Sequence, residues 1–486
     1  MQRRLVDLTA RPFDVLVIGG GICGLTVACD AAQRGLTVAL VERHDFGSGT
    51  SFNHLRTIHG GLRYLQHLDI PRARESIAER RTLAAIAPWA VSPTPFVLPL
   101  RRSLAKGRLA MRAGFALDGL LAKHRNRDLP ASHHLPSGHV LSPEEARQRY
   151  PLLRKVPMTG AAVWHDYVAT DADRLTFSWA QAAAAHGAVL ANYVSAGALR
   201  INNQRLAVVT VTDRHTDTTF EIVARTVVNA TGADLDHLLA GVGLKTGMPV
   251  TKAMNLVTNL QVPRAAIGGR SPAGRNFFMV PWQGRALFGT WESGTFDATT
   301  DVSARAADVS AFVRDISDTF PSLGVTDASI TLVHRGIVPA VKKGAHGATP
   351  DGREQLHDHA LGGYPQIISV AGTKYTTARA MAEKVTTRLL RALGRPAVAC
   401  RTATTALPTP PSDGEPRLLL ADQEMVATLE DAVVRRTRLG ALGAPAPEVL
   451  TNAARIVGGR LGWAAARRAQ EIDDVRRFYA DRAPKQ

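Results

Sequence analysis

The chain has few cysteines, few aromatic residues and no long apolar run. Of its 486 residues, 3 are cysteines and 6% are aromatic. No apolar stretch approaches the roughly 18 residues that cross a membrane, so we predict a soluble or peripheral protein. Cys23, Cys29 and Cys400 lack the spacing of metal ligands, and we predict neither a disulfide nor a metal site. The N-terminal segment MQRRLVDLTARPFD lacks a secretory apolar region, which predicts a cytoplasmic location.

Acidic residues are also scarce relative to basic ones. There are 42 Asp and Glu against 59 Lys and Arg, which gives a formal net charge of +17. Such a charge attracts anionic lipid, nucleic acid and phosphorylated metabolites alike. The chain has neither a zinc finger nor the basic and aromatic pattern of RNA-binding modules, so nucleic acid is not an expected partner.

The sequence allows two interpretations of one basic segment. The residues from Leu100 to Arg127, LRRSLAKGRLAMRAGFALDGLLAKHRNR, mix Lys and Arg with Leu, Met and Phe. A basic amphipathic helix of this kind can lie on an anionic membrane surface. The same pattern also suits a solvated face of a helix that packs on the core. The sequence does not decide between these two interpretations.

What the chain does have is a dinucleotide-binding pattern near its start. Gly19, Gly21 and Gly24 form G-x-G-x-x-G directly after the apolar run Val15 to Ile18, and Glu42 ends the next apolar run. The first glycine permits a tight turn, the second lets the backbone approach a pyrophosphate, and the third lets the helix pack closely on the strand. The acid can accept a hydrogen bond from a ribose hydroxyl. The pattern fits NAD and FAD equally well.

Later segments return to this nucleotide-binding pattern. The run TVVNATG, which starts at Thr226, is a buried strand ending in a glycine turn. The segment from Ile367, IISVAGTKYTTARAMAEKV, reads as a strand, a glycine turn and a long helix, whose first amides are free to meet an electron-rich group. Between them, Val250 to Glu292 alternates apolar and polar residues as an antiparallel sheet does. A Pro and Gly linker, TALPTPPSDGEP, precedes a helical tail.

Segments spread over the whole chain resemble the FAD-dependent glycerol-3-phosphate dehydrogenases. They are DVLVIGGGICG at Asp14, GTSFNHLRTIHGGLRYLQ at Gly49, VVNATG at Val227, FFMVPW and LFGT at Phe277 and Leu287, ISVAGTKYTTAR at Ile368 and EMVATLEDAVVRRTRLG at Glu424. The second, fifth and sixth of these are specific to the family. The resemblance implies FAD as the cofactor.

The resemblance also implies a fold of the amino-acid-oxidase and glutathione-reductase type. The fold class would be α/β plus α+β, with a Rossmann-like FAD-binding domain interleaved with an antiparallel-sheet substrate domain. We expect the FAD-binding domain over residues 1–90, 145–250 and 330–400. The substrate domain would take 91–144 and 251–329, and a small helical C-terminal domain would take 413–486.

By this resemblance, four segments would form the cofactor site. The ADP half of FAD would be held by Gly19, Gly21, Gly24 and Glu42. The flavin would be bordered by Thr50, Ser51, His59, Gly60 and Gly61. The pyrophosphate would lie near Ala230, Thr231 and Gly232. The isoalloxazine would meet Gly372, Thr373, Lys374 and Tyr375, where the helix start and Lys374 would stabilise the negative charge of the reduced flavin.

The substrate half departs from the family pattern at two positions. The stretch TKAMN ends in Asn255 where the family usually has His, and RGIVPAV has Val338 where the family has a phosphate-binding Arg. Val cannot replace a guanidinium that holds phosphate in a bidentate manner. Arg335 could compensate only if the local backbone allowed it. Arg353 corresponds to a second family arginine and is our candidate anchor for an anionic substrate, with Asn255 and Arg335 as further substrate-binding candidates.

Oxidation of a secondary alcohol needs a base for the hydroxyl proton and a hydride acceptor. His59 is the leading candidate for the base, although it could instead only hydrogen-bond the flavin or backbone. The catalytic set would then be His59, Arg353 and Lys374.

The sequence leaves three hypotheses for the function of the protein. The first is glycerol-3-phosphate dehydrogenation with electrons passed to a quinone at an anionic membrane surface on the cytoplasmic side. The second is oxidation of another polyol, hydroxy acid or amine on the same fold, which Val338 and Asn255 favour. The third is a flavin-bound protein without catalysis. The sequence predicts no oligomeric state.

Overall fold

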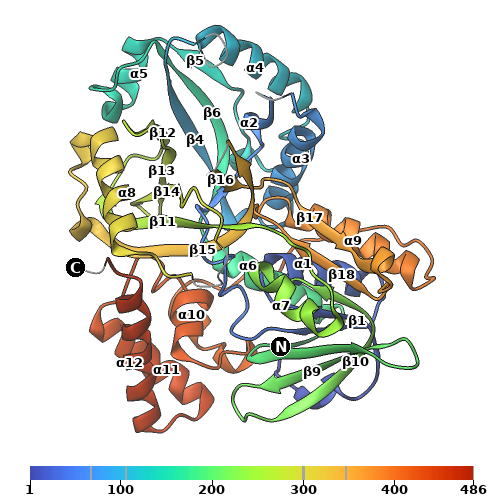
Figure 1. The fold of residues 1–486 in the computed structure, drawn as a ribbon. Helices are drawn as coiled ribbons and strands as arrows, with labels where there is room; N and C mark the ends of the chain where they lie inside the picture. The colour runs from blue at the N-terminus through green and yellow to red at the C-terminus, as the bar shows by residue number, and fades with distance from the viewer. Residues whose placement is uncertain (66–67, 104–106, 298–301, 345–346, 485–486) are drawn as a thin grey trace.

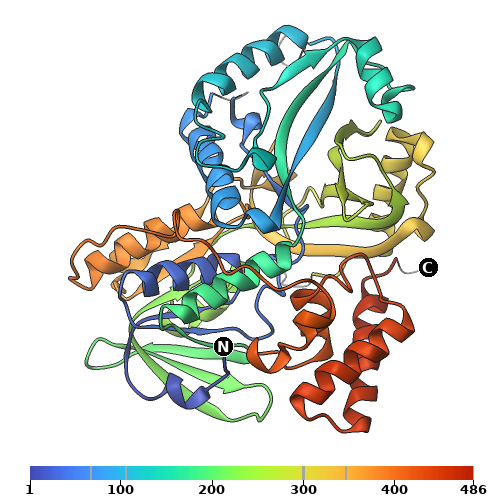
Figure 2. The ribbon, with the colours of Figure 1, turned by 180° about the vertical axis from the view of Figure 1, so that it is seen from behind.

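The structure is a computed structural model that describes residues 1–65, 68–103, 107–297, 302–344 and 347–484. Two sheets and a helical C-terminal part make up the molecule (Figure 1). The first sheet lies at the lower right of that view, the second sheet lies above it, and the C-terminal helices lie below the second sheet and beside the first. The same three parts are seen from behind in Figure 2.

The first sheet is built around the dinucleotide-binding pattern. Its central strands run parallel in the order β18, β10, β1, β2, β7; β17 pairs antiparallel with β18, and β8 and β9 extend it from β10. The bounds are β1 Phe13–Ile18, β2 Val38–Val41, β7 Val189–Ala191, β8 Val194–Ile201, β9 Ala207–Asp213, β10 Thr219–Asn229, β17 Gln355–Asp358 and β18 Ile367–Ala371.

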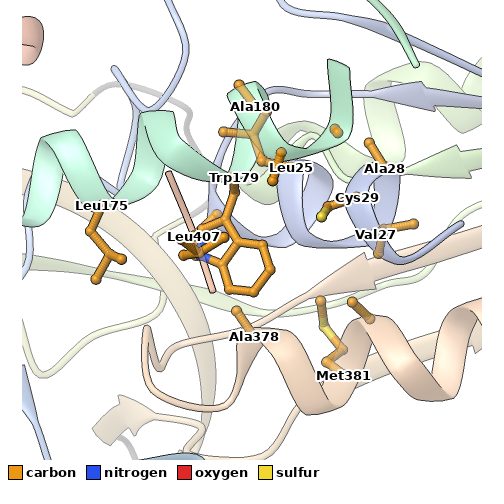
Figure 3. Close-up of a cluster of buried hydrophobic side chains, with 14 of the residues drawn as sticks. Leu25, Val27, Ala28, Cys29, Leu175, Trp179, Ala180, Ala378, Met381 and Leu407 are labelled. Carbon is orange, nitrogen blue, oxygen red and sulfur yellow. The ribbon is translucent and has the colours of Figure 1, made fainter. Parts of the chain in front are cut away.

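Both faces of this sheet are buried, which explains the unbroken apolar runs of its strands. Along β1, Val15 and Val17 belong to one core cluster, and Leu16 and Ile18 belong to another on the opposite face. Helices α1 (Ile22–Gln33), α6 (Ala172–Ala185) and α9 (Ala378–Ala392) cover the first face. Trp179 of α6 packs among residues of all three helices (Figure 3). The sheet extension β8 to β10 contributes to the second cluster.

The second sheet is mostly antiparallel. Its order is β16, β15, β11, β14, β13, β12, β4, β6, β3, with β5 paired to β6. The bounds are β3 Thr57–Ile58, β4 Val91–Leu100, β5 His139–Leu141, β6 Gly160–Ala169, β11 Val250–Gln261, β12 Ala266–Arg270, β13 Asn276–Trp282, β14 Arg285–Glu292, β15 Ile330–Lys343 and β16 Gly347–Pro350. Helix α8 (Ala306–Thr319) packs on one face of it through Val309 and Phe312.

The remaining helices surround these sheets. Helices α2 and α3 follow β3 in the chain, α4 and α5 lie at the far end of the second sheet, and α10 to α12 form the C-terminal part (Figure 1). Their bounds are α2 Leu62–Leu65, α3 Ile70–Ile86, α4 Arg108–Leu121, α5 Pro143–Arg149, α7 Leu235–Leu239, α10 Glu415–Leu418, α11 Pro447–Leu461 and α12 Ala465–Asp481. Residues 104–106 of the basic segment lie outside the described residues.

The predicted fold class is confirmed, but sheet membership differs from the expected domain ranges. Strands β6 and β15, which fall in the ranges 145–250 and 330–400, pair within the second sheet and not within the cofactor sheet. The short strand β3, in the range 1–90, also joins the second sheet. Apolar patterning identifies a strand but not its partner, so the chain crosses between the sheets more often than the sequence indicates.

Candidate active site

A long cavity runs between the cofactor sheet, the second sheet and the end of α12. Twelve of the predicted cofactor residues line it, from the first glycine turn to the start of α9. They are Gly19, Gly21, Glu42, Thr50, Ser51, Ala230, Thr231, Gly232, Gly372, Thr373, Lys374 and Tyr375. Four predicted cofactor residues lie outside the lining, namely Gly24, His59, Gly60 and Gly61.

The glycine turn is too tightly packed for side chains. Gly19 has φ +108°, and a Cβ on it would lie 2.5 Å from the carbonyl oxygen of Ala230. A Cβ on Gly24 would lie 1.9 Å from the carbonyl oxygen of Gly19. Gly24 therefore lets α1 approach β1, the role expected of the third glycine, without lining the cavity itself.

Glu42 lies at the end of β2, beside the glycine turn. Its Oε2 accepts a hydrogen bond from the amide of Gly20 at 2.6 Å, and its Oε1 accepts one from the amide of His44 at 2.8 Å. Burial raises the pKa of Glu42 although these bonds oppose the shift. Each oxygen keeps a second lone pair, so the carboxylate can still accept from a ribose hydroxyl.

The loop after Glu42 connects both walls of the cavity. Ser51 Oγ accepts from the amide of Ile22 at 2.9 Å, at the start of α1. Thr50 Oγ1 donates to the carbonyl of Ile337 at 3.0 Å, and Asn53 Oδ1 accepts from the amide of Arg335 at 2.9 Å. The loop thus holds the free edge of β15 against the cofactor sheet.

Lys374 also lines the cavity, in the turn between β18 and α9. Burial lowers its pKa to about 8, and the charge of Arg72 adds to that effect. Its Nζ lies 4.1 Å from the centroid of the Tyr64 ring, and the Arg72 guanidinium carbon lies 4.6 Å from the same centroid. Two cations therefore contact one aromatic ring beside this turn.

His59 lies close to Lys374 but does not line the cavity. Its ring centroid is 6.4 Å from that of Tyr64. Burial lowers the pKa of His59 to about 4, so the imidazole is neutral at pH 7. The turn that follows is held by Asp166, whose Oδ1 accepts from the amide of Gly60 at 2.8 Å and pairs with Arg80.

The three predicted substrate-binding residues do not all line the cavity. Asn255 is buried and satisfied, because its Nδ2 donates to the carbonyl of Asn53 at 2.9 Å and its Oδ1 accepts from Thr290 at 3.1 Å. Arg335 forms an ion pair with Asp481 of α12. Arg353 is exposed and outside the cavity lining. Of the three, only Arg335 lines the cavity.

Val338 also lines the cavity, and Arg335 does not replace the missing guanidinium there. The two residues are three apart on β15, and their partners on β11 are Thr251 and Met254. Side chains of a strand alternate between its faces, so these two project from opposite faces of the sheet. The Arg335 guanidinium is turned toward α12 and not into the space beside Val338.

Sequence reasoning missed several lining residues. His54 stacks on the Tyr375 ring with centroids 4.8 Å apart, and its Nε2 is buried without a hydrogen-bond partner among the described residues. Arg482, at the end of α12, also lines the cavity. His54 lies within the specific segment that begins at Gly49, which could have identified it. Nothing in the sequence links Arg482 to a turn more than 400 residues earlier.

The described part of the chain contains neither a metal site nor a membrane span. No group of three His, Cys, Asp or Glu residues there could hold a metal ion. None of the helices within 1–65, 68–103, 107–297, 302–344 and 347–484 has the length and apolar character needed to cross a membrane.

The residues fit a flavin dinucleotide. A tight glycine turn and a carboxylate line the cavity, as the ADP half requires, together with backbone from two further strand ends. Lys374, in the turn before α9, provides positive charge for the reduced ring system.

Comparisons with known proteins agree with this site. The FAD dependent oxidoreductase family matches residues 14–388. Glycerol-3-phosphate dehydrogenase 1 of Mycobacterium tuberculosis is 34% identical over 85% of this chain and 80% of its own length. Glycerol-3-phosphate dehydrogenase of Synechocystis is 29% identical over 84% of this chain and 75% of its own length.

A solved structure shares the whole fold. The glycerol-3-phosphate dehydrogenase of Bacillus halodurans, complexed with FAD, covers 99% of this chain and 97% of its own length, with a TM-score of 0.75 at 23% identity. The predicted cofactor is confirmed as FAD by the family match. The chain therefore belongs to the FAD-dependent oxidoreductases and, within them, to the family of the glycerol-3-phosphate dehydrogenases.

Proposed function

We propose that this enzyme oxidises glycerol-3-phosphate to dihydroxyacetone phosphate and passes the electrons to a quinone. The proposal rests on a single cavity that is lined both by the dinucleotide-binding turn and by Lys374. The names of the relatives support the substrate, since both sequence relatives above are glycerol-3-phosphate dehydrogenases.

The residues near Lys374 have the chemistry that alcohol oxidation needs. FAD, when bound, accepts the carbinol hydrogen as a hydride. The neutral imidazole of His59 is available to take the hydroxyl proton. Lys374 is mainly protonated at pH 7, so it can attract an anionic substrate and stabilise negative charge on the reduced cofactor. Arg353 follows Gly352, at which a Cβ would lie 3.5 Å from Lys374 Cε, and we propose that it anchors the substrate anion.

A second candidate function is oxidation of another polyol, hydroxy acid or amine. It is favoured by the apolar Val338 in the cavity wall, by the ion pair of Arg335 with Asp481 and by the satisfied amide of Asn255. These three features leave fewer groups for a phosphate than the family pattern provides.

Anaerobic flavin reduction distinguishes the candidates. Purified holoenzyme is mixed with glycerol-3-phosphate and, separately, with a panel of polyols, hydroxy acids and amines. Bleaching of the flavin by glycerol-3-phosphate supports the first function, and bleaching by another compound alone supports the second. Reduction by dithionite alone would leave the protein without a catalytic role.

We further propose that α4 binds the anionic cytoplasmic face of the membrane. Its solvent face carries Leu109 and Leu120, which are 79% and 72% exposed. Exposed cations lie on the helix and in the segments next to it in the chain, namely Arg112 on α4, Arg101 and Arg102 before it, and Lys123 and Arg127 after it. Apolar side chains flanked by cations suit an interface between lipid tails and anionic headgroups. The helix lies at the outer end of the second sheet (Figure 1).

Vesicle sedimentation tests this surface. We expect the protein to bind vesicles with anionic headgroups at low salt, and the double variant Leu109→Gln, Leu120→Gln to bind more weakly. Leu361→Gln is the matched control, because Leu361 is fully exposed elsewhere on the molecule. Equal binding of all three proteins would reject α4 as the contact.

A further inference from the structure

His54 presents an aromatic ring to the cofactor cavity. It belongs to the loop between Ser51 and β3, and it lines the cavity together with Lys374 and Tyr375. Its imidazole stacks on the Tyr375 ring, with centroids 4.8 Å apart and planes inclined by 14°. The Tyr375 hydroxyl lies 2.9 Å from Thr176 Oγ1 of α6, so a hydrogen bond holds the tyrosine ring in place. Because Tyr375 directly follows Lys374 in the chain, His54 lies at the turn that is expected to meet the isoalloxazine.

One ring nitrogen of His54 is bound by the backbone, which fixes the position of the imidazole proton. The amide of Arg56 donates to Nδ1 at 3.2 Å. Burial, and next the charge of Arg56, hold the pKa of His54 well below its usual value, so the ring is neutral at pH 7. A neutral imidazole has a single N–H, and a nitrogen that accepts a hydrogen bond does not carry it. The proton therefore lies on Nε2, which is a hydrogen-bond donor.

This donor has no acceptor among the described residues. The Nε2 atom of His54 is buried, and the described part of the chain forms no hydrogen bond with it. Buried N–H groups in native proteins are rarely left unpaired, so a bound ligand is expected to supply the acceptor. His334 also has unpaired ring nitrogens, but it packs against Phe52 and Trp282 and does not line the cavity. Of these two histidines, only His54 can be reached by a cofactor in the cavity.

The surroundings of His54 favour an acceptor that gains negative charge. Lys374, with a pKa of about 8, is mainly a cation at pH 7. Reduction of FAD adds negative charge to acceptor atoms of the isoalloxazine. A hydrogen bond to a charged acceptor is stronger than one to a neutral acceptor, and a donor that is already oriented needs no rearrangement as the charge develops. The neutral N–H of His54 provides this stabilisation without a third positive charge beside Lys374 and Arg56.

We infer that His54 Nε2 donates a hydrogen bond to the isoalloxazine and thereby raises the midpoint potential of bound FAD. The Tyr375 ring and the Arg56 amide set the orientation of this donor. A higher potential makes the oxidised cofactor a better hydride acceptor, whichever alcohol or amine the enzyme oxidises. The inference therefore goes beyond the proposed substrate and depends only on FAD in the cavity.

The midpoint potential tests this donor without any substrate. Holoenzyme is titrated anaerobically with dithionite beside a reference dye at pH 7, and the absorbance of the flavin and of the dye is followed. His54→Phe keeps a flat ring against Tyr375 but lacks the donor. We expect its equilibrium constant for flavin reduction to fall about tenfold, which lowers the midpoint potential by about 30 mV for a two-electron couple. His54→Gln has an amide N–H of comparable reach, so it should restore most of the potential.

The matched control is His124→Phe, because His124 is exposed on the turn after α4, and its potential should equal that of the unmodified enzyme. If His54→Phe retains no FAD, His54→Leu, which also lacks the donor, takes its place and should show the same fall. The difference from the unmodified enzyme should be constant between about pH 6 and about pH 7, since the imidazole stays neutral there. An unchanged potential in the donor-free variant, an equal fall in His54→Gln or a difference that varies over this pH range would overturn the inference.

Discussion

Burial lowers the pKa of both His59 and Lys374, yet it leaves them in different protonation states at pH 7. His59, with a pKa of about 4, is a neutral acceptor of a proton, and Lys374, with a pKa of about 8, is mainly a cation. A proton acceptor and a cation therefore lie beside the same Tyr64 ring.

Replacing His59 tests its role as the base. His59→Asn should slow flavin reduction by the substrate about 100-fold, the usual scale for loss of a general base. Stopped-flow absorbance under anaerobic conditions measures this rate. His124→Asn is the control, because His124 is exposed on the turn after α4. An unchanged rate in His59→Asn would remove the residue from that role.

The lowered pKa of Lys374 leads us to expect a loss of activity at alkaline pH. The ammonium form is required, so kcat/KM should fall as the pH rises through about 8. His59 must stay neutral, so its acid limb should appear only as the pH approaches about 4. In Lys374→Arg the alkaline limb should move to higher pH, because a guanidinium keeps its proton. If the limb near pH 8 persisted in this variant, another group would have to cause it.

At the level of helices and strands, local patterns predicted the cofactor turn well and the sheet partners poorly. The unit β1, α1, β2 has its glycines and its acid at the spacing that fixes its geometry, so short-range sequence was sufficient. The alternation in β15 showed a strand, but its pairing with β11 depends on contacts between residues about 80 positions apart. Only the folded chain shows that pairing.

The close contact between α1 and β1 gives a sharp prediction. Gly24→Ala would place a Cβ 1.9 Å from the carbonyl oxygen of Gly19, so the helix start must shift. We expect a loss of about 1 to 3 kcal/mol of unfolding free energy and weaker FAD binding. Gly459→Ala in α11 is the matched control, since a Cβ there meets nothing within 4 Å. Thermal denaturation and FAD titration measure both effects, and equal behaviour of the two variants would contradict the packing argument.

Across the whole molecule, buried ion pairs join the C-terminal helices to the cofactor sheet. Asp45, three residues after Glu42, accepts from Arg435 Nε at 2.6 Å and from Arg436 Nη1 and Nη2 at 2.7 and 2.8 Å. Burial opposes ionisation of Asp45, but the two guanidinium groups outweigh it and hold its pKa well below the usual range. The segment RRTRLG indicated the family but not this partner, which lies about 390 positions away.

Asp45→Asn should therefore loosen the C-terminal part. The substitution takes from the buried Arg436 the carboxylate with which it pairs, whereas Arg435 keeps its pairs with Glu430 and Asp431. The expected loss is about 3 kcal/mol of unfolding free energy. Asp422→Asn is the control, because its pair with Arg460 is exposed and should contribute nothing measurable. Thermal denaturation and limited proteolysis after residue 413 report the effect. A variant as stable as the control would show that these ion pairs do not hold the two parts together.

The positions of the predicted substrate residues also depend on contacts between parts of the chain that are far apart in sequence. Arg335 was predicted to be near the substrate, but α12 reaches the same strand and pairs with it through Asp481. The C-terminal helices contribute Arg482 to the cavity, so they complete the site as well as stabilise the fold. Local motifs predicted many of the residues that line the cavity, whereas the positions of the predicted substrate residues depend on the arrangement of all three parts.

One cavity, lined by the first glycine turn and by Lys374, is expected to bind FAD. The visible absorbance spectrum of the purified chain, with the FAD content released on denaturation, tests it most directly. We expect a yellow protein with about one FAD per chain, as a single dinucleotide site requires. A colourless protein that takes up no added FAD would contradict it.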